Sequence, residues 1–284
     1  MGSNLTLRAG VLSFVIFALF IAAWHIATRQ TGAVANMDPE YAKLMGLTAT
    51  QGKSAMPGPL DVGAKLWEHI RRPFYDNGPN DKGVGIQLAY SIARVAAGYL
   101  LAVLFALPIG MMVGRVPTAR MLLDPFLQVM RPIPVTAWLP LSMILFGLGA
   151  KSAFALVCLG AFYPILLNTI FGVRSVDPKL FEAASMLGCK GNAQFFKVVL
   201  PAATPSIFTG LRLGLGLAWF VIVVGEMTGV PEGLGAVIMD GRTLSRTDLV
   251  IAGMIVIGVA GFVTDRLIVL LNNRLLRWSP QHHV

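Results

Sequence analysis

The residues with the clearest chemical potential are an arginine and two prolines inside a long apolar stretch. Arg131 is followed by Pro132 and Pro134, and all three lie within the apolar run Met121–Leu148. Two prolines leave backbone groups without helical partners, and unwound backbone is tolerated at membrane depth only beside protein or a water-filled cavity. A broken helix beside a cation could bind an anion. The structural alternative is a kinked, packed helix with a paired arginine.

Other side chains in apolar runs could line a transport path. Trp138, six residues after Pro132, could wall such a path, and simple packing is its alternative role. Glu226 ends another apolar run, where it could face an outer vestibule or pair with a cation there. Arg94 and Arg212 lie within about two turns of a helix end, so both could extend to the lipid headgroups.

Patterns for catalysis are lacking. None of the four histidines belongs to an H-E-x-x-H pair, and neither a G-x-S-x-G elbow nor a Walker A sequence occurs. The two cysteines, Cys158 and Cys189, are too few for a disulfide scaffold or a four-cysteine zinc site. We therefore expect no metal site, no cofactor and no enzymatic activity in this chain, and a conduit is favoured over a catalyst.

The elements that must position these residues are membrane helices. The 284 residues are 55% hydrophobic and 13% charged, about half the charged fraction of soluble domains. A helix needs about 20 apolar residues to cross the hydrocarbon core. The sequence predicts an all-α integral membrane protein with six such spans: Gly10–Ala27, Leu88–Gly114, Met121–Leu148, Ala153–Val173, Ser206–Glu226 and Leu249–Val263, the last extending through Asp265 and Arg266.

The first span has an alternative interpretation as a signal peptide. Arg8 precedes it, and Ala33–Ala35 resembles a cleavage site. However, the apolar run is longer than the roughly 7–15 residues of a signal core, and the cleavage-like sequence lies well downstream. A retained anchor is therefore favoured.

Basic residues in the short loops predict the orientation. With a cytoplasmic N-terminus, the inner loops carry most of them: Arg8, Arg115, Arg120, Arg174, Lys179, Lys190, Lys197, Arg266, Arg274 and Arg277, against Lys151, Arg242 and Arg246 outside. Short cytoplasmic loops are enriched in Lys and Arg, so both termini are predicted to be cytoplasmic. The net charge of +9 thus reflects topology, and no nucleic-acid partner is expected.

The long outer segment contains a predicted amphipathic helix. Pro57-Gly58-Pro59 breaks the chain, and Asp61 then caps the sequence VGAKLWEHIRR. Its apolar residues lie near one face: Val62, Leu66, Trp67 and Ile70. Such a helix is expected to lie on the membrane surface, where it either covers the ends of the spans or docks an external partner.

An inner loop, residues 174–204, carries the sharpest motif. Asp177-Pro178 predicts a helix start, and Gly188 predicts its end. Ala183 and Ala184 would give this short helix a smooth face, and Glu182 would supply a charge for a partner.

This loop resembles the signature of permease subunits of ATP-driven (ABC) importers, which reads E-A-A, three residues, G, nine residues, an aliphatic, one residue, L-P. The matching positions are Glu182, Ala183, Ala184, Gly188, Val198, Leu200 and Pro201. The resemblance implies the type I ABC importer permease fold, with this loop as a cytoplasmic coupling helix seated in an ATPase subunit. It further implies two copies of this chain, two ATP-binding cassette subunits that hold ATP and Mg, and a periplasmic or lipid-anchored substrate-binding protein.

Other segments narrow the resemblance. Arg131–Gly149, Phe162–Pro178 and Phe208–Trp219 resemble nitrate, sulfonate, taurine and bicarbonate permeases. Met37–Gly46 and Pro73–Val95 are most similar to nitrate permeases, with bicarbonate permeases close behind. The sequences after Trp138 and around Glu226 look more like those of sulfonate permeases. Nitrate is the favoured substrate, and nitrite or cyanate could be carried as well.

The predicted organisation has three parts. Residues 1–87 hold the anchor helix and the periplasmic segment, residues 88–271 form a five-helix permease core in contact with membrane lipids, and residues 272–284 form a cytoplasmic tail. The expected location is the bacterial inner membrane. Rival functions are a membrane enzyme or assembly scaffold without an ATPase partner, and an ion-driven carrier, although the sequence shows no internal repeat or midplane carboxylate.

Overall fold

Helices make up most of the described part of the chain. The computed structural model describes residues 2–30, 56–78 and 82–275, in which the one β-bridge pairs Asp76 with Lys82. The predicted all-α class is confirmed for these residues. The nitrate-permease-like segment Met37–Gly46, the cleavage-like Ala33–Ala35 and most of the predicted tail lie outside them.

The chain divides into two compact units. The first consists of Met1–Tyr75 and Val237–Ile255, and the second of Asp76–Ala236 and Val256–Val284. The first unit contains α1 (Gly2–Gln30) and α3 (Pro59–Arg71). Two further helices, α11 (Leu234–Thr243) and α12 (Thr247–Leu275), contribute residues to both units.

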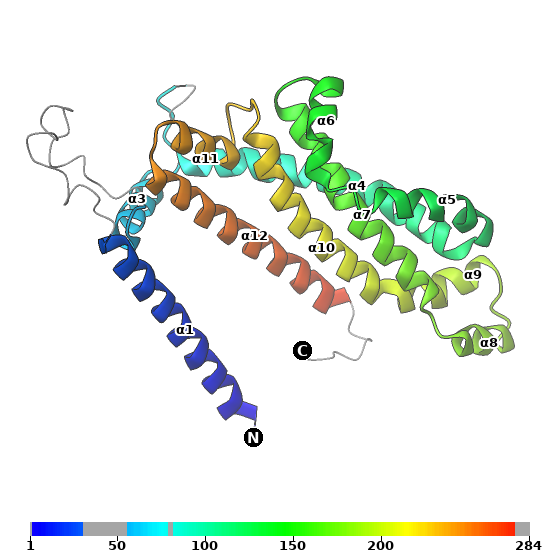
Figure 1. Cartoon of the computed structure of the whole chain (residues 1–284). Helices are drawn as coiled ribbons and strands as arrows, with labels where there is room; N and C mark the ends of the chain where they lie inside the picture. The colour runs from blue at the N-terminus through cyan, green and yellow to red at the C-terminus, as the bar shows by residue number, and fades with distance from the viewer. Residues whose placement is uncertain (1, 31–55, 79–81, 276–284) are drawn as a thin grey trace, which may run out of the picture. The chain divides into compact units, whose positions relative to one another are not determined.

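The second unit holds the remaining helices (Figure 1). In chain order these are α4 (Val84–Arg115), α5 (Pro117–Met130), a 3₁₀ turn (Val135–Trp138), α6 (Leu139–Phe146), α7 (Ala150–Arg174), α8 (Pro178–Met186), α9 (Asn192–Gln194), a π-helical turn (Phe195–Val199) and α10 (Leu200–Glu226).

Five helices are long and apolar enough to cross a membrane within the described residues. They cover Gly10–Thr28, Val84–Arg115, Ala150–Arg174, Asn192–Glu226 and Thr247–Arg274. The predicted third span is not one straight helix, because α5 and the segment Val135–Phe146 meet at 88°. Pro132 and Pro134 lie at this break, where proline removes amide donors and restricts the preceding residue. The count reaches six only if this bent pair forms one span.

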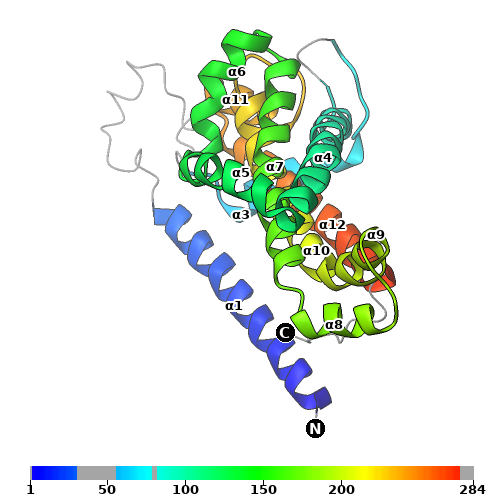
Figure 2. The same cartoon turned by 90° about the vertical axis from the view of Figure 1, so that its right-hand side faces the viewer.

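Helix α7 is the centre of the second unit, where it packs against α4 and α10 (Figures 1 and 2). Val157, Ala161 and Ile165 on α7 have no exposed surface. Gly214 of α10 lets the two backbones approach closely, since a Cβ there would lie 2.9 Å from Cγ1 of Ile165. Gly210 makes a similar approach to α7. Gly210 and Gly214 stand four residues apart, the spacing at which small residues let membrane helices pack closely.

Within the same unit, α10 and α12 are joined by an ion pair. Arg212 donates from both Nε and Nη2 to the two carboxylate oxygens of Asp265, the second bond measuring 2.8 Å. The Arg212 side chain is 56% exposed, so its extension to the headgroups stays a prediction. Trp219 on α10 adds a hydrogen bond of 2.9 Å from Nε1 to Oγ1 of Thr264.

The predicted amphipathic helix corresponds to α3. It begins at Pro59, earlier than expected, with Gly58 as its N-cap. Asp61 is the third helical residue, and its carboxylate accepts a hydrogen bond of 3.1 Å from the Gly58 amide. Asp61 therefore caps from inside the helix, as the acidic residue of a capping box does. Trp67 remains 58% exposed, so α3 keeps an uncovered apolar face.

Candidate functional site

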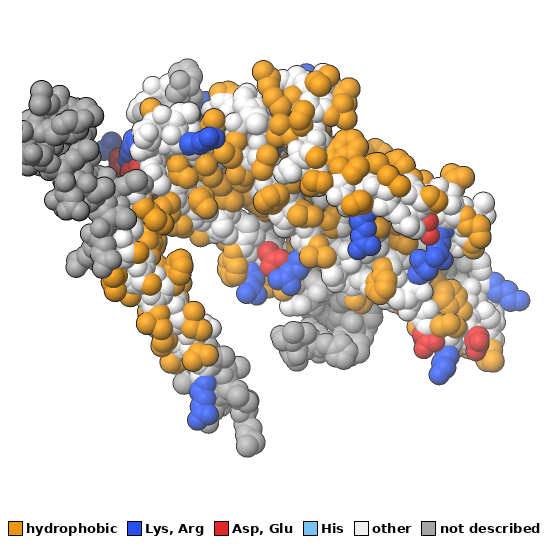
Figure 3. Space-filling model, in the orientation of Figure 1, with side chains coloured by type: hydrophobic (Ala, Val, Ile, Leu, Met, Phe, Trp, Pro, Cys, Tyr) orange, Lys and Arg blue, Asp and Glu red, His pale blue; other side chains and the backbone are white. Residues whose placement is uncertain are grey.

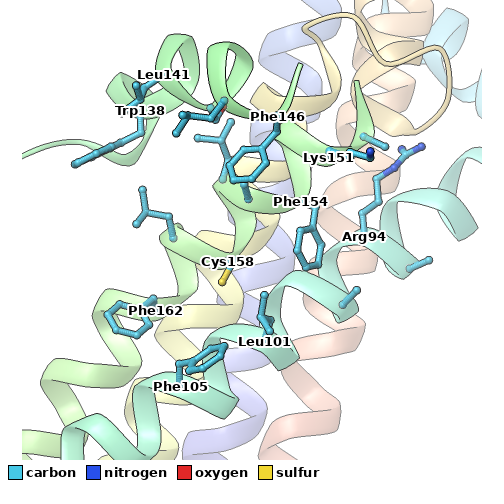
Figure 4. Close-up of a pocket in the computed structure, with 18 of the residues that line it drawn as sticks. Arg94, Leu101, Phe105, Trp138, Leu141, Phe146, Lys151, Phe154, Cys158 and Phe162 are labelled. Atoms are coloured by element: carbon cyan, nitrogen blue, oxygen red, sulfur yellow. The ribbon is translucent and has the colours of Figure 1, made fainter. Parts of the chain in front are cut away.

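Trp138 and helix α6, which follow the bend after α5, form one wall of a pocket of about 1080 Å³. Helices α4 and α7 supply its other walls (Figure 4). The α4 side contributes every fourth residue of one face: Ala93, Ala97, Leu101, Phe105 and Ile109. That stripe extends about 24 Å along the helix at 1.5 Å per residue. The stripe is therefore almost as long as the roughly 30 Å hydrocarbon core of a bilayer is thick.

The walls of this pocket are almost entirely apolar. Phe146, Phe154 and Phe162 line it from α6 and α7, and Ser142 turns its hydroxyl to the Leu139 carbonyl at 2.8 Å. Charged side chains enter the lining only at Arg94 and Lys151, and both lie at the end away from Phe162 in Figure 4. Such a pocket combines hydrophobic walls with a few positioned polar groups, as ligand sites commonly do.

The predicted path residues are only partly at this pocket. Trp138 lines it, whereas Arg131, Pro132 and Pro134 are exposed and are not part of its lining. Arg131 is the C-terminal cap of α5. Glu226 does not line the pocket either, and its side chain has no exposed surface.

Glu226 is the acceptor at the centre of a buried polar network. Arg94 Nη1 donates to its Oε1 at 2.8 Å, and Ser91 Oγ lies 2.9 and 2.7 Å from the two carboxylate oxygens. The Gly235 amide donates to Oε2 at 3.0 Å. The predicted pairing of Glu226 with a cation is confirmed. The expectation that Arg94 reaches the headgroups is wrong, because its side chain is 13% exposed and bound to Glu226.

The same network fixes the segment between α10 and α11. The Gly233 amide donates to Gln87 Oε1 at 2.6 Å, and the Leu234 amide donates to Ser91 Oγ at 2.9 Å. Gly233 has φ of +120°, and a Cβ at this position would overlap the Glu226 carboxyl group. Both the backbone angle and the space therefore require glycine here. The network joins α4 to the end of α10 through buried, hydrogen-bonded groups.

One sequence signal for this network is the spacing of polar residues on α4. Gln87, Ser91 and Arg94 stand four and three residues apart, which places them on one face of an otherwise apolar helix. Their partner at Glu226 is 132 residues from Arg94 in the sequence. The spacing of these polar residues indicates a buried polar contact, but their partner can be identified only from the fold.

The signature loop folds as α8, a turn and α9, and α8 lies at one end of the second unit (Figure 2). Asp177 accepts a hydrogen bond of 2.9 Å from the Lys179 amide and so caps α8, as predicted. Gly188, with φ of +78°, ends the helix, and the Cys189 amide donates to the Ala184 carbonyl at 2.9 Å. This left-handed turn is the reason for glycine at Gly188.

The faces of α8 differ in exposure. Glu182 and Ala183 are exposed, whereas Ala184 is buried at 6% exposure against its own chain. Met186 and Leu187 are 88% and 87% exposed. Figure 3 shows charged side chains together with hydrophobic ones at the end of the unit that carries α8. This end presents the mixed polar and apolar surface that a protein partner can cover.

The signature loop is also tied to the spans. Arg115, at the end of α4, donates to Asn192 Oδ1 at 3.0 Å and stacks over the Phe195 ring at 4.9 Å. Gln194 donates to the Phe181 carbonyl of α8 at 2.9 Å. Leu200 and Pro201 begin α10 directly after the π-helical turn. A displacement of α8 would therefore act on α4 and α10.

Two curated relatives match most of this chain. A permease named for aliphatic sulfonate transport, from Bacillus subtilis, is 44% identical over 195 residues, covering 69% of this chain and 71% of the relative. The nitrate import permease of Synechocystis is 36% identical over 220 residues, covering 78% of this chain and 80% of the relative.

Solved structures and a family comparison agree with the fold. A chain of the MetNI methionine ABC transporter in an inward-facing conformation superposes with a TM-score of 0.53 at 16% identity, over 72% of this chain and 96% of that one. At this identity the likeness establishes the fold alone. Residues 106–277, which include the signature loop and most of the pocket, match the family described as binding-protein-dependent transport system inner membrane component. The chain belongs to this family of inner-membrane components of binding-protein-dependent transport systems.

Proposed function

We propose that this chain is the permease subunit of an ATP-driven importer for a small oxyanion, with nitrate as the first candidate and nitrite or cyanate as further cargo. Two copies of the chain assemble with two ATPase subunits, which bind ATP and Mg. A periplasmic or lipid-anchored binding protein delivers the anion. Both termini lie in the cytoplasm, and the permease itself has no catalytic role.

The observation that carries this proposal is the solvent-exposed face of α8. Glu182 and Ala183 are accessible to a partner, and Met186 and Leu187 next to them are almost fully exposed. Closure of the ATPase subunits on ATP would push α8. The Arg115–Asn192 bond would pass that movement to α4, and the continuous π-turn would pass it to α10. The pocket between α4, α6 and α7 then opens to alternate sides of the membrane.

A second candidate substrate is an aliphatic sulfonate. The apolar walls of the pocket favour it, because burying a bare inorganic anion among aromatic and aliphatic side chains is unfavourable. An alkyl group would instead gain from those walls. The greater identity with the sulfonate-named relative points the same way. Taurine and bicarbonate remain alternatives within the same importer class.

The direct test is ATP hydrolysis and uptake by this chain reconstituted with its ATPase subunits and binding protein. Nitrate, taurine and bicarbonate are compared at equal concentrations. Stimulation by nitrate alone supports the first proposal, and stimulation by taurine alone moves the substrate to the sulfonate class. Failure to form a complex with any ATPase would leave the scaffold and ion-driven carrier as the leading functions.

The substitution Glu182→Arg tests the role of α8. It reverses an exposed charge on the proposed docking face, so we expect ATP-driven uptake to be abolished while the chain still inserts and folds. Co-purification with the ATPase subunits and uptake into proteoliposomes are the measurements. Glu68→Arg on α3 is the control, since it also reverses an exposed glutamate but lies outside the loop. Normal uptake by Glu182→Arg would contradict the coupling role.

A further inference from the structure

Helix α3 of the first unit has one side that packs and one that does not. Val62 is buried at 2% exposure, and Leu66 on the same side is half-buried. The other side holds Leu60, Trp67 and Ile70, which are 76%, 58% and 60% exposed. Trp67 follows Leu60 by seven residues and Ile70 follows Trp67 by three, which is the spacing of one helix face. These three residues form the apolar face of α3, and the described residues leave it uncovered.

The start of α3 lies beside the end of a candidate membrane span. That span is Gly10–Thr28 of α1, which belongs to the same compact unit. A Cβ at Gly58, the N-cap of α3, would lie 3.5 Å from Oγ1 of Thr28. A helix that starts where a span ends begins at the boundary between the hydrocarbon core and the headgroups. Because its 13 residues extend only about 20 Å, α3 is too short to cross the core, and a position along the bilayer surface is favoured.

The acidic groups of α3 are bound within the helix, whereas two arginines at its end are not. The Asp61 carboxylate accepts a backbone amide at the helix start at 3.1 Å, and Glu68 pairs with Lys65. Arg71 and Arg72 are exposed, and neither forms an ion pair with a described residue. The end of α3 therefore presents two guanidinium groups that an anionic group from outside the chain can bind.

Arg71 lies against the apolar face of α3. Its guanidinium carbon is 5.6 Å from the centre of the Trp67 ring, one helical turn earlier. Tryptophan is enriched at membrane–water interfaces, where its ring meets apolar chains and its N–H meets the polar layer. An arginine beside such a ring can cover apolar surface with its stem and hold its charge at the level of the headgroups. Asp248 of α12 also acts electrostatically on α3, but it lies 3.8 Å from Arg246 and so has a cation of its own.

We propose that α3 is an interfacial membrane helix that binds anionic phospholipids. Its apolar face inserts into the leaflet at which α1 ends, and Arg71 and Arg72 bind the lipid phosphates. Helices of this kind bury their apolar face about 5–10 Å into the boundary between headgroups and acyl chains. A guanidinium edge matches two oxygens of a phosphate, which makes arginine well suited to this contact. The inference does not depend on which anion the importer carries.

A bilayer fits the apolar face of α3 better than a soluble partner does. The start of α3 is fixed beside the end of α1, so membrane insertion of α1 brings this face to the lipid in every copy of the protein. A soluble partner would have to displace lipid that is always present. The helix also keeps a polar side, because Glu68 is 67% exposed and lies about 200° around the helix from Ile70. One side can therefore enter the bilayer while the other stays in water.

Fluorophore labelling tests the insertion of the apolar face. Ile70→Cys is introduced into the full chain without its native cysteines (Cys158→Ala, Cys189→Ala), labelled with an environment-sensitive fluorophore and reconstituted into vesicles that contain brominated phospholipids. We expect lipids brominated near the headgroup to quench this label more than lipids brominated near the chain end, because the helix lies at a shallow depth. A label at Glu68→Cys is the matched control and should be quenched at least about threefold less, since it lies on the polar side. Equal quenching of the two labels would overturn the insertion. An apolar environment at Ile70→Cys that no brominated lipid reaches would overturn it too, and would show that a protein surface covers the face.

The same label tests the two arginines. Brominated phosphatidylglycerol and brominated phosphatidylcholine are compared at equal mole fraction as quenchers of the Ile70→Cys label. Phosphatidylglycerol should quench about twofold or more strongly, because basic side chains near the surface attract anionic headgroups. Arg71→Gln combined with Arg72→Gln should abolish this preference. Lys179→Gln combined with Lys190→Gln is the matched control, since it removes two exposed cations of the signature loop and should leave the preference intact. Equal quenching by the two lipids when both arginines are present, or a preference that survives their loss, would overturn the anionic-lipid site.

Discussion

At the scale of single residues, burial decides which charged side chains can act together. Glu226 was expected to meet a cation, and the structure identifies that cation as Arg94. Arg131, the most conspicuous arginine in the sequence, is exposed beside the break after α5. The sequence favoured Arg131 as the functional cation and assigned Arg94 to the lipid headgroups. Which of the two lies beside the pocket depends on the fold.

Gly233→Ala tests how tightly the Glu226 network is packed. The added methyl group would overlap the Glu226 carboxyl and adopt an unfavourable backbone angle, so the protein should lose about 1–3 kcal/mol of stability. Thermal unfolding in detergent measures this loss. Gly147→Ala is the control, because Gly147 also has a positive φ of +79° but open space around it. An equal loss in both variants would mean that backbone strain, and not the carboxyl contact, requires Gly233.

At the scale of the elements, most spans could be predicted because length and apolarity suffice for them. Leu88–Gly114 and Ala153–Val173 lie within α4 and α7. The bend of the third span could be predicted only as a break at Pro132 and Pro134. Its angle of 88° is not specified by any local sequence pattern. The pocket depends on that angle and was therefore beyond sequence reasoning.

Gly214→Leu tests the contact between α10 and α7. A side chain there must enter the space of Ile165 and the Ala161 carbonyl, so the helices would separate and stability should fall by at least about 1–3 kcal/mol. Gly216→Leu on the same helix is the control, since nothing lies within 4 Å of its added Cβ. The yield of folded protein and its thermal unfolding distinguish them. Equal behaviour of the two variants would contradict this packing.

At the scale of the whole molecule, the family could be recognised from seven residues of one loop, because their spacing encodes a helix, its end and the start of the next span. The tie from this loop to α4 through Arg115 could not be read from the sequence, since Asn192 is 77 residues away. The orientation of the chain in the membrane rests on loop charge alone and stays a prediction.

Cysteine labelling tests that orientation. In Cys158→Ala, Cys189 of the signature loop is the one cysteine left in the chain. A membrane-impermeant maleimide should modify it in inside-out vesicles and not in right-side-out vesicles, because the loop is predicted to be cytoplasmic. Glu68→Cys in a background without the two native cysteines should show the reverse pattern. Labelling of Cys189 from outside would reverse the predicted topology.

The exposed end of α8 has a consequence for how the cell must supply this protein. The side chains of Met186 and Leu187 are almost completely exposed. They lie in a loop that is predicted to face the cytoplasm, outside the lipid bilayer. Uncovered apolar side chains in an aqueous compartment attract chaperones and proteases. A permease copy made without an ATPase subunit would keep these apolar side chains exposed until the copy was degraded. Because the apolar residues of α8 need an ATPase subunit to cover them, we expect the cell to produce the permease and the ATPase in matched amounts.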